Sequence, residues 1–225
     1  MRTADHMNLS RYIMDHMDAG ASKLQKAAFI FGSIEPDINM LTYFRGSIRD
    51  EEKLRGHNYE NVMKYMEKLT KKLEKGGMGT VRQSFLLGKL VHYVADSFTY
   101  PHNSIFSGNL REHCQYETEL HDYVNQMISS DNVNLDSIDD GIDIVEYLEE
   151  IHYRYVSEAL GCENDYRHIT HAISVVTERF WQTESVSVPS MRDVAIACKE
   201  HIPVTANVSM AAAGQTGMDA HTRVA

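Results

Sequence analysis

Residues 81–95 carry the feature that most constrains how this chain can fold. Apolar side chains recur there at spacings of three and four, which places them on one broad face of a helix. These side chains are Phe85, Leu86, Leu90, Val91 and Val94. Pro101 has no backbone N–H and restricts the residue before it, so the helix has to end by about residue 100. The pattern predicts a long helix that is buried near the centre of the protein.

The same helical spacing recurs along the rest of the chain, which contains only four prolines. We expect further helices at 6–17, 23–31, 58–75, 110–128, 142–160, 165–183 and 191–201. The alternation typical of a strand occurs only weakly, at 185–188. The sequence therefore predicts an all-α fold, organised as a single-domain bundle of several helices.

The 225 residues are enough for one domain that buries a core of ordinary size. We place this domain at 1–203, because the sequence after Pro203 becomes small and polar. Residues 204–225 are expected to form a flexible C-terminal tail. The three cysteines, Cys114, Cys162 and Cys198, are odd in number and widely spaced. That pattern fits neither a disulfide framework nor a metal clip, so we expect free thiols.

The charge balance excludes some classes of partner. The chain has 22 Lys and Arg against 32 Asp and Glu, which gives a formal net charge of −10. Proteins that bind nucleic acid or anionic membranes mainly by electrostatics need a basic face, so no stable nucleic-acid partner is expected. No apolar run approaches the roughly 20 residues of a transmembrane helix. The first residues lack the apolar stretch of a secretory signal, so we expect a cytoplasmic protein, or a secreted one if a leader has been removed.

The 12 histidines are unusual, and several of them follow a pattern that suits metal binding. His92 and Asp96 are four residues apart, so they project from the same face of the predicted central helix. His102 follows the end of that helix, and His113 and Glu117 repeat the four-residue spacing. Imidazole nitrogen and carboxylate oxygen are both zinc ligands. Two pairs on neighbouring helices predict one shared metal site.

Other readings of these histidines remain open. A single His and Asp pair at this spacing is more often a hydrogen-bonded surface pair. His121 lies four residues after Glu117 and would serve in place of His113 in an inverted pair. His168 and His171 have no supporting carboxylates and are expected to be structural, and His16 is expected to be exposed or to cap a helix.

The order of these residues resembles the zinc-dependent phospholipase C family and the related single-strand-specific zinc nucleases. The resemblance rests first on the spacing of His92, Asp96, His102, His113 and Glu117. Upstream, Phe29-Ile-Phe-Gly32-Ser-Ile-Glu-Pro36-Asp37 is similar to the family's Gly to Pro-Asp segment, Gly56-His57-Asn58 to its next histidine, and Thr3-Ala-Asp-His6 to its N-terminal histidine. The similarity covers about residues 3–121. It implies the all-α bundle of the zinc phospholipase C type.

The resemblance also implies a ligand set for two or three zinc ions. One zinc would be held by Asp37, His57, His92 and Asp96, and a second by His102, His113 and Glu117. In the family a third ion is bound by the counterparts of Asp96 and His6 and by the first residue of the mature chain, usually Trp. The only Trp here is Trp181. The third site is therefore absent, completed by another residue, or built from the amine of Met1 or Arg2.

The implied activity is metal-dependent hydrolysis of a phosphodiester. A zinc-bound hydroxide would attack phosphorus, and Asp37 would be the catalytic residue that orients or deprotonates that water. The substrate would be a phosphodiester, with phospholipid as the first candidate. A nuclease or nucleotide phosphodiesterase of the same fold is the alternative, and a non-catalytic metal-binding protein is a further one. The oligomeric state stays open.

Overall fold

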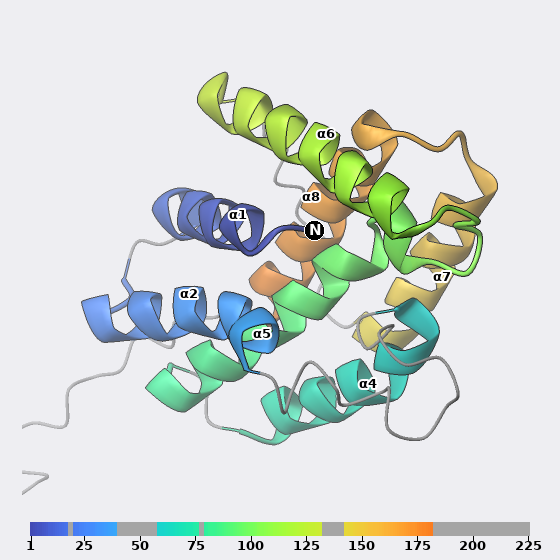
Figure 1. Ribbon diagram of the computed structural model, residues 1–225. Coiled ribbons are helices and arrows are strands. Elements are labelled where there is room, and N and C mark those ends of the chain that lie inside the picture. The colour runs from blue at the N-terminus through green and yellow to red at the C-terminus, as the bar shows by residue number, and fades with distance from the viewer. Residues whose placement is uncertain (18–19, 40–57, 77–78, 132–141, 182–225) are drawn as a thin grey trace, which may run out of the picture. The chain divides into compact units, whose positions relative to one another are not determined.

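The computed structural model describes residues 1–17, 20–39, 58–76, 79–131 and 142–181, and this part of the chain is helical without strands. The prediction of an all-α fold is confirmed. The helices, shown in Figure 1, are α1 (Thr3–Met17), α2 (Lys23–Ile38), α4 (Tyr59–Lys75), α5 (Val81–Ser97), the 3₁₀ helix η1 (Tyr100–His102), α6 (Leu110–Ser129), α7 (Ile144–Ser157) and α8 (Cys162–Phe180).

Helix α5 is the centre of this bundle. The side chain of Thr80 caps its first turn by accepting a hydrogen bond from the Gln83 N–H. Most of its side chains are buried, because α1, α2, α4 and α8 all pack against it. The helix ends at Ser97, and the chain then turns through η1, which contains Pro101. The predicted central helix and its end before residue 100 are therefore both correct.

Two glycines allow α2 and α5 to cross with their backbones in contact. A Cβ atom on Gly88 would lie 2.1 Å from the carbonyl oxygen of Phe29, and one on Gly32 would lie 2.2 Å from that of Phe85. Both distances are far below van der Waals contact, so the crossing requires glycine on each helix. This close approach brings the backbone of α2 up to the buried side chains of α5.

Helix α2 continues seven residues beyond the predicted end at residue 31. Pro36 lies inside its last turns, where proline removes one backbone donor, but the Asn39 N–H still bonds the Glu35 carbonyl at 2.9 Å. Pro36 is buried, so packing holds the helix together through the proline. Helix α8 likewise begins three residues earlier than predicted.

Several predictions concern residues outside the described ranges. They are the ligand His57, the helix at 191–201, the weak strand at 185–188, Cys198, and the boundary at residue 203 between the domain and its tail. Contacts group Met1–Glu184 into one unit. Of the other cysteines, Cys114 and Cys162 are both free thiols. Within the described residues we find no helix with the length and apolarity needed to cross a bilayer.

Candidate metal centre

The site is built around His92 and Asp96, which lie one turn apart on α5 and are fully buried. Nδ1 of His92 lies 2.8 Å from the carbonyl oxygen of Ser33 on α2. A carbonyl only accepts, so Nδ1 carries a hydrogen and donates it. Nε2 is the ring nitrogen that remains for a metal ion, and it faces Asp96 at 3.3 Å from Oδ2. A ring held in this way is prepared to bind a metal ion.

Four side chains from three helices converge at this point: His6 of α1, Asp37 of α2, and His92 and Asp96 of α5. Each offers one ligand atom, and these atoms all lie within 4.8 Å of one another. Nε2 of His6 is 3.2 Å from Asp96 Oδ1, and Asp37 Oδ1 is 3.6 Å from Nε2 of His92. We call these four residues the first ligand group.

A second ligand group consists of His102, His113 and Glu117, which also offer ligand atoms within 4.8 Å of one another. Glu117 Oε1 lies 3.3 Å from Nε2 of His113, one turn before it on α6, and 3.4 Å from Nε2 of His102 in η1. The turn after α5 therefore returns His102 to the same region, as the sequence predicts.

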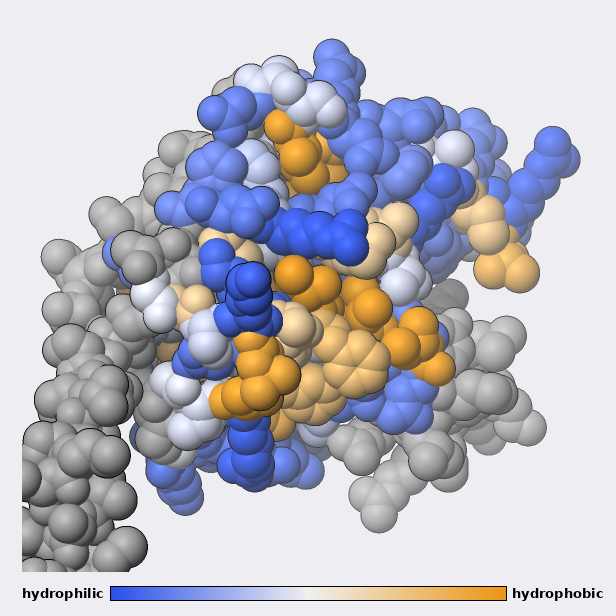
Figure 2. All heavy atoms as spheres, turned by 90° about the vertical axis from the view of Figure 1, so that its left-hand side faces the viewer, coloured by the Kyte–Doolittle hydropathy of each residue, from blue (hydrophilic) through white to orange (hydrophobic). Residues whose placement is uncertain are grey.

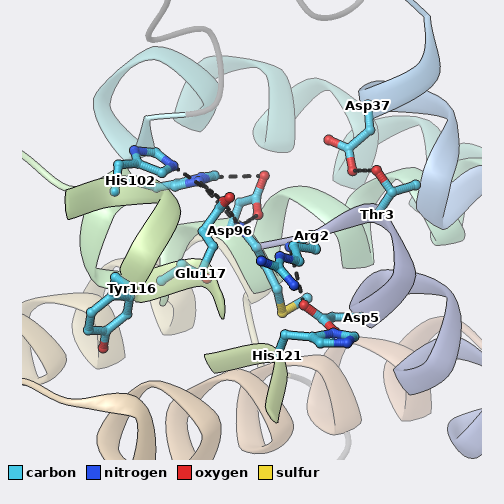
Figure 3. Close-up of polar contacts among 12 residues, drawn as sticks. Arg2, Thr3, Asp5, Asp37, Asp96, His102, Tyr116, Glu117 and His121 are labelled. Atoms are coloured by element: carbon cyan, nitrogen blue, oxygen red, sulfur yellow. Dashed lines mark hydrogen bonds and ion pairs between the residues drawn. The ribbon is translucent and has the colours of Figure 1, made fainter. Parts of the chain in front are cut away.

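The two groups meet at Asp96. Its Oδ2 lies 3.5 Å from Nδ1 of His102, and its Oδ1 lies 3.1 Å from the amine of Met1. This amine is also 3.0 Å from Glu117 Oε1. Figure 3 shows Asp96 and Glu117 close together beside His102, with Asp37 turned toward Thr3 at the start of α1.

Burial and charge act together on the ionisation of these groups. Burial and the neighbouring His92 lower the pKa of His6 to about 4, so the ring is neutral at pH 7. Burial opposes ionisation of Asp96, but the Met1 amine and the surrounding histidines outweigh it and hold the pKa of Asp96 well below its usual range. Burial also opposes the charge of the Met1 amine, yet Asp96 and Glu117 raise the pKa of this amine to about 10.

This donor set fits zinc. All ligand atoms are imidazole nitrogens or carboxylate oxygens, which zinc accepts in protein sites. Three carboxylates, Asp37, Asp96 and Glu117, supply negative charge, and the rings of His6 and His92 stack with their centroids 3.9 Å apart. A divalent cation would compensate the buried Asp96 and the partly buried Asp37 and Glu117.

A chain of hydrogen bonds links the turn that carries His102 of the second ligand group to α7. Nδ2 of Asn103 donates to the carbonyl oxygens of Ser97 and Thr99, at 3.1 and 2.9 Å. This fixes the Asn103 amide so that its Oδ1 accepts from Nε2 of His152, 2.7 Å away. The turn that carries His102 is therefore held by a buried hydrogen-bond chain from α5 to α7.

The structure brings together seven of the eight predicted ligands, and only His57 lies outside the described residues. It places His113, and not His121, with Glu117. His121 instead bonds the buried Asp5 through Nδ1, and His168 pairs with Glu158 at 2.9 Å. His16 is exposed, as expected.

Sequence reasoning missed three partners of this centre: the Ser33 carbonyl, the hydroxyl of Thr3, which donates to Asp37 at 2.8 Å, and His152. The Thr3 position belongs to the motif before His6 and was a detectable signal. The Ser33 carbonyl is backbone, so no residue type marks it.

Comparison with known proteins identifies the group to which this architecture belongs. A family model described as zinc-dependent phospholipase C matches residues 5–162, more than half of the chain. The chain belongs to the zinc-dependent phospholipase C family. The matched segment runs from α1 to the start of α8, so it contains all seven described ligands. No curated protein and no solved structure matches the chain.

Proposed function

We propose that this protein is a zinc-dependent phosphodiester hydrolase that acts on phospholipids, as its family membership and its two ligand groups indicate. The observation that carries the proposal is the convergence of His6, Asp37, His92 and Asp96 around one point. The second ligand group lies beside the first, because Nδ1 of its His102 is 3.5 Å from Oδ2 of Asp96. Two adjacent cation sites suit hydrolysis of a phosphodiester, because both the attacking and the leaving oxygen need stabilisation.

The zinc ligands in this proposal are His6, Asp37, His57, His92, Asp96, His102, His113 and Glu117. Two or three zinc ions bound there would supply positive charge for the phosphoryl oxygens and activate a water molecule. Asp37 would orient or deprotonate this water, and the Thr3 hydroxyl, which donates to the Asp37 carboxylate, would hold that carboxylate in place. The Ser33 carbonyl keeps His92 in the tautomer that binds metal.

We favour phospholipid over nucleic acid as the substrate because the net charge of −10 repels a polyanion. Parallel assays with phosphatidylcholine and with single-stranded DNA separate the two substrates. Faster turnover of DNA would assign the protein to the nuclease branch and contradict the phospholipid substrate.

The test of the function is the substitution Asp96→Asn, assayed on phosphatidylcholine and on a soluble chromogenic phosphodiester. We expect the rate to fall by more than about 100-fold, because Asp96 contacts both ligand groups and an amide is a poor zinc ligand. Metal content, measured by mass spectrometry, should fall from two or three zinc per chain.

The matched control is Asp122→Asn, which makes the same chemical change at an exposed position on α6. It should leave both the rate and the zinc content unchanged. A rate of phosphodiester hydrolysis that is unchanged by Asp96→Asn and by chelation would contradict the proposal. Full zinc content without hydrolysis would favour a non-catalytic metal-binding protein.

A further inference from the structure

Helix α2 is apolar on its outer side as well as on the side that faces the core. Phe29, Gly32, Ser33 and Pro36 are buried, whereas Leu24, Phe31 and Ile38 keep 64%, 50% and 56% of their surface exposed. The three exposed residues are spaced by seven, so they form one stripe along the helix. Large apolar side chains that share one exposed stripe are available to pack against another surface.

The start of α5 extends this stripe into a patch. Val81 is 39% exposed, and the ring of Phe85 stacks on that of Phe31 with centroids 5.8 Å apart. We call Leu24, Phe31, Ile38, Val81 and Phe85 the apolar patch. Figure 2 looks onto this side of the molecule and shows apolar side chains gathered there within a hydrophilic border. Contiguous patches of this kind mark interaction sites.

The charges beside the apolar patch differ from those of the whole chain. Lys23 and Arg82 are both exposed, and they adjoin Leu24 and Val81 in the sequence. The chain as a whole has a net charge of −10. A surface of apolar side chains bordered by cations complements the phosphate-bearing surface of a phospholipid bilayer.

The apolar patch is also connected to the candidate metal centre. Its stripe ends at Ile38, the residue after Asp37, on the same helix that supplies this ligand. We propose that the apolar patch docks the protein onto a phospholipid bilayer, with Leu24 and Phe31 inserted at the interface. The inference rests on the proposed phospholipid substrate, and it names the surface through which the enzyme reaches that substrate.

The experiment is co-sedimentation of the full chain with phosphatidylcholine vesicles, with and without phosphatidylglycerol. The double variant Leu24→Ser/Phe31→Ser should lower the partition coefficient by about tenfold or more, because it removes two large apolar side chains from the interface. Phosphatidylglycerol should strengthen binding of the wild type, and salt should reduce this added part. The matched control is Tyr153→Ser on α7, which removes a side chain that is 79% exposed elsewhere and should leave binding unchanged.

Two further measurements separate the possible outcomes. The double variant should keep its melting temperature and its rate on the soluble phosphodiester, while its rate on vesicles falls. A wild type that does not sediment with vesicles, or a double variant that sediments equally well, overturns the proposal. Light scattering that finds a wild-type dimer and a monomeric double variant also overturns it, because the apolar patch would then join two copies of the chain.

The docking proposal can fail or stand independently of the catalytic one. Asp96→Asn should still bind vesicles, because the apolar patch contains none of the ligands. Vesicle binding that depends on Leu24 and Phe31 in a protein without hydrolytic activity would support docking and contradict the proposed function.

Discussion

The buried carboxyl of Asp165, which is not a predicted metal ligand, links four helices of this fold through its hydrogen bonds. It is fully buried on α8, and it accepts hydrogen bonds from the backbone N–H of Tyr100 at 2.8 Å and from the hydroxyls of Tyr116 and Tyr155 at 2.9 and 2.8 Å. These donors come from η1, α6 and α7. Burial outweighs the three hydrogen bonds and raises the pKa of Asp165 to about 6.

The raised pKa of Asp165 predicts a definite dependence of stability on pH. In the unfolded chain this carboxyl ionises near 3.8, so between pH 4 and 6 the folded chain binds more protons. The contribution to the free energy of unfolding is therefore present below about pH 4 and is lost as the pH rises to 6, by up to about 3 kcal/mol. Urea denaturation of wild type and Asp165→Asn across this range, with a chelator present, measures the effect.

The difference between the two proteins is the informative quantity in that experiment. His152 acts in the opposite direction, because burial lowers its pKa to about 4 and its contribution is lost as the pH falls from 6.5. Both proteins contain His152, so subtraction removes its effect. A difference that stays constant between pH 4 and 6 would contradict the assignment to Asp165.

At the residue scale, the sequence predicted the candidate metal ligands better than it predicted the groups that hydrogen-bond to them. The four-residue spacing of His92 and Asp96, and of His113 and Glu117, is a direct property of a helix, so it could be read without a structure. The Ser33 carbonyl and the Asn103 amide act through tertiary contacts that no spacing records. The contact of the Met1 amine with Asp96 joins residues 95 positions apart, so it too is a tertiary contact that no spacing records.

At the scale of helices, the crossing of α2 and α5 decides whether His92 meets Ser33. We predict that Gly88→Ala lowers the free energy of unfolding by about 2 kcal/mol or more, because the new Cβ atom would clash with the Phe29 carbonyl. The same variant should lose zinc content, since moving α2 away removes both the Ser33 carbonyl and Asp37. Thermal denaturation and metal analysis measure the two effects.

Ser84→Ala provides the control for that substitution. It lies one turn earlier on α5, is also buried, and removes an oxygen without adding bulk. It should change zinc content little. Gly88→Ala with normal stability would mean that the helices can separate at no cost, contrary to the close crossing.

Helices with a clear apolar period were predicted well, and the main error was the end of α2. The sequence suggested an end at residue 31, but burial of Pro36 carries the helix on to Ile38. This extension matters for the proposed zinc ligands, because it places Asp37 in the last turn of a helix. The outer stripe of α2 also depends on it, since Ile38 completes the spacing of seven.

At the scale of the whole molecule, the candidate metal centre takes its residues from α1, α2, α5, η1 and α6, so bound zinc should stabilise the fold. We predict that chelation lowers the melting temperature by about 10 °C, because a ligand present at about 1,000 times its dissociation constant adds about 4 kcal/mol. Adding zinc should restore the melting temperature, and adding magnesium should not, because the ligands include imidazoles. Equal melting temperatures with and without chelator would contradict a zinc centre that links these helices.

The position of Asp96 between the two ligand groups has a consequence for how the protein acquires its metal. A carboxylate that neighbours both groups cannot respond to one cation without changing the free energy with which the other is bound. Thermodynamic linkage makes that influence reciprocal and equal in size. Binding of metal ions at the two groups would therefore be coupled. Positive coupling would make partly loaded molecules rarer than independent sites allow, and negative coupling would make them commoner. The fraction of fully loaded protein would then follow a binding curve against the concentration of free metal, and the coupling through Asp96 would set the steepness of that curve.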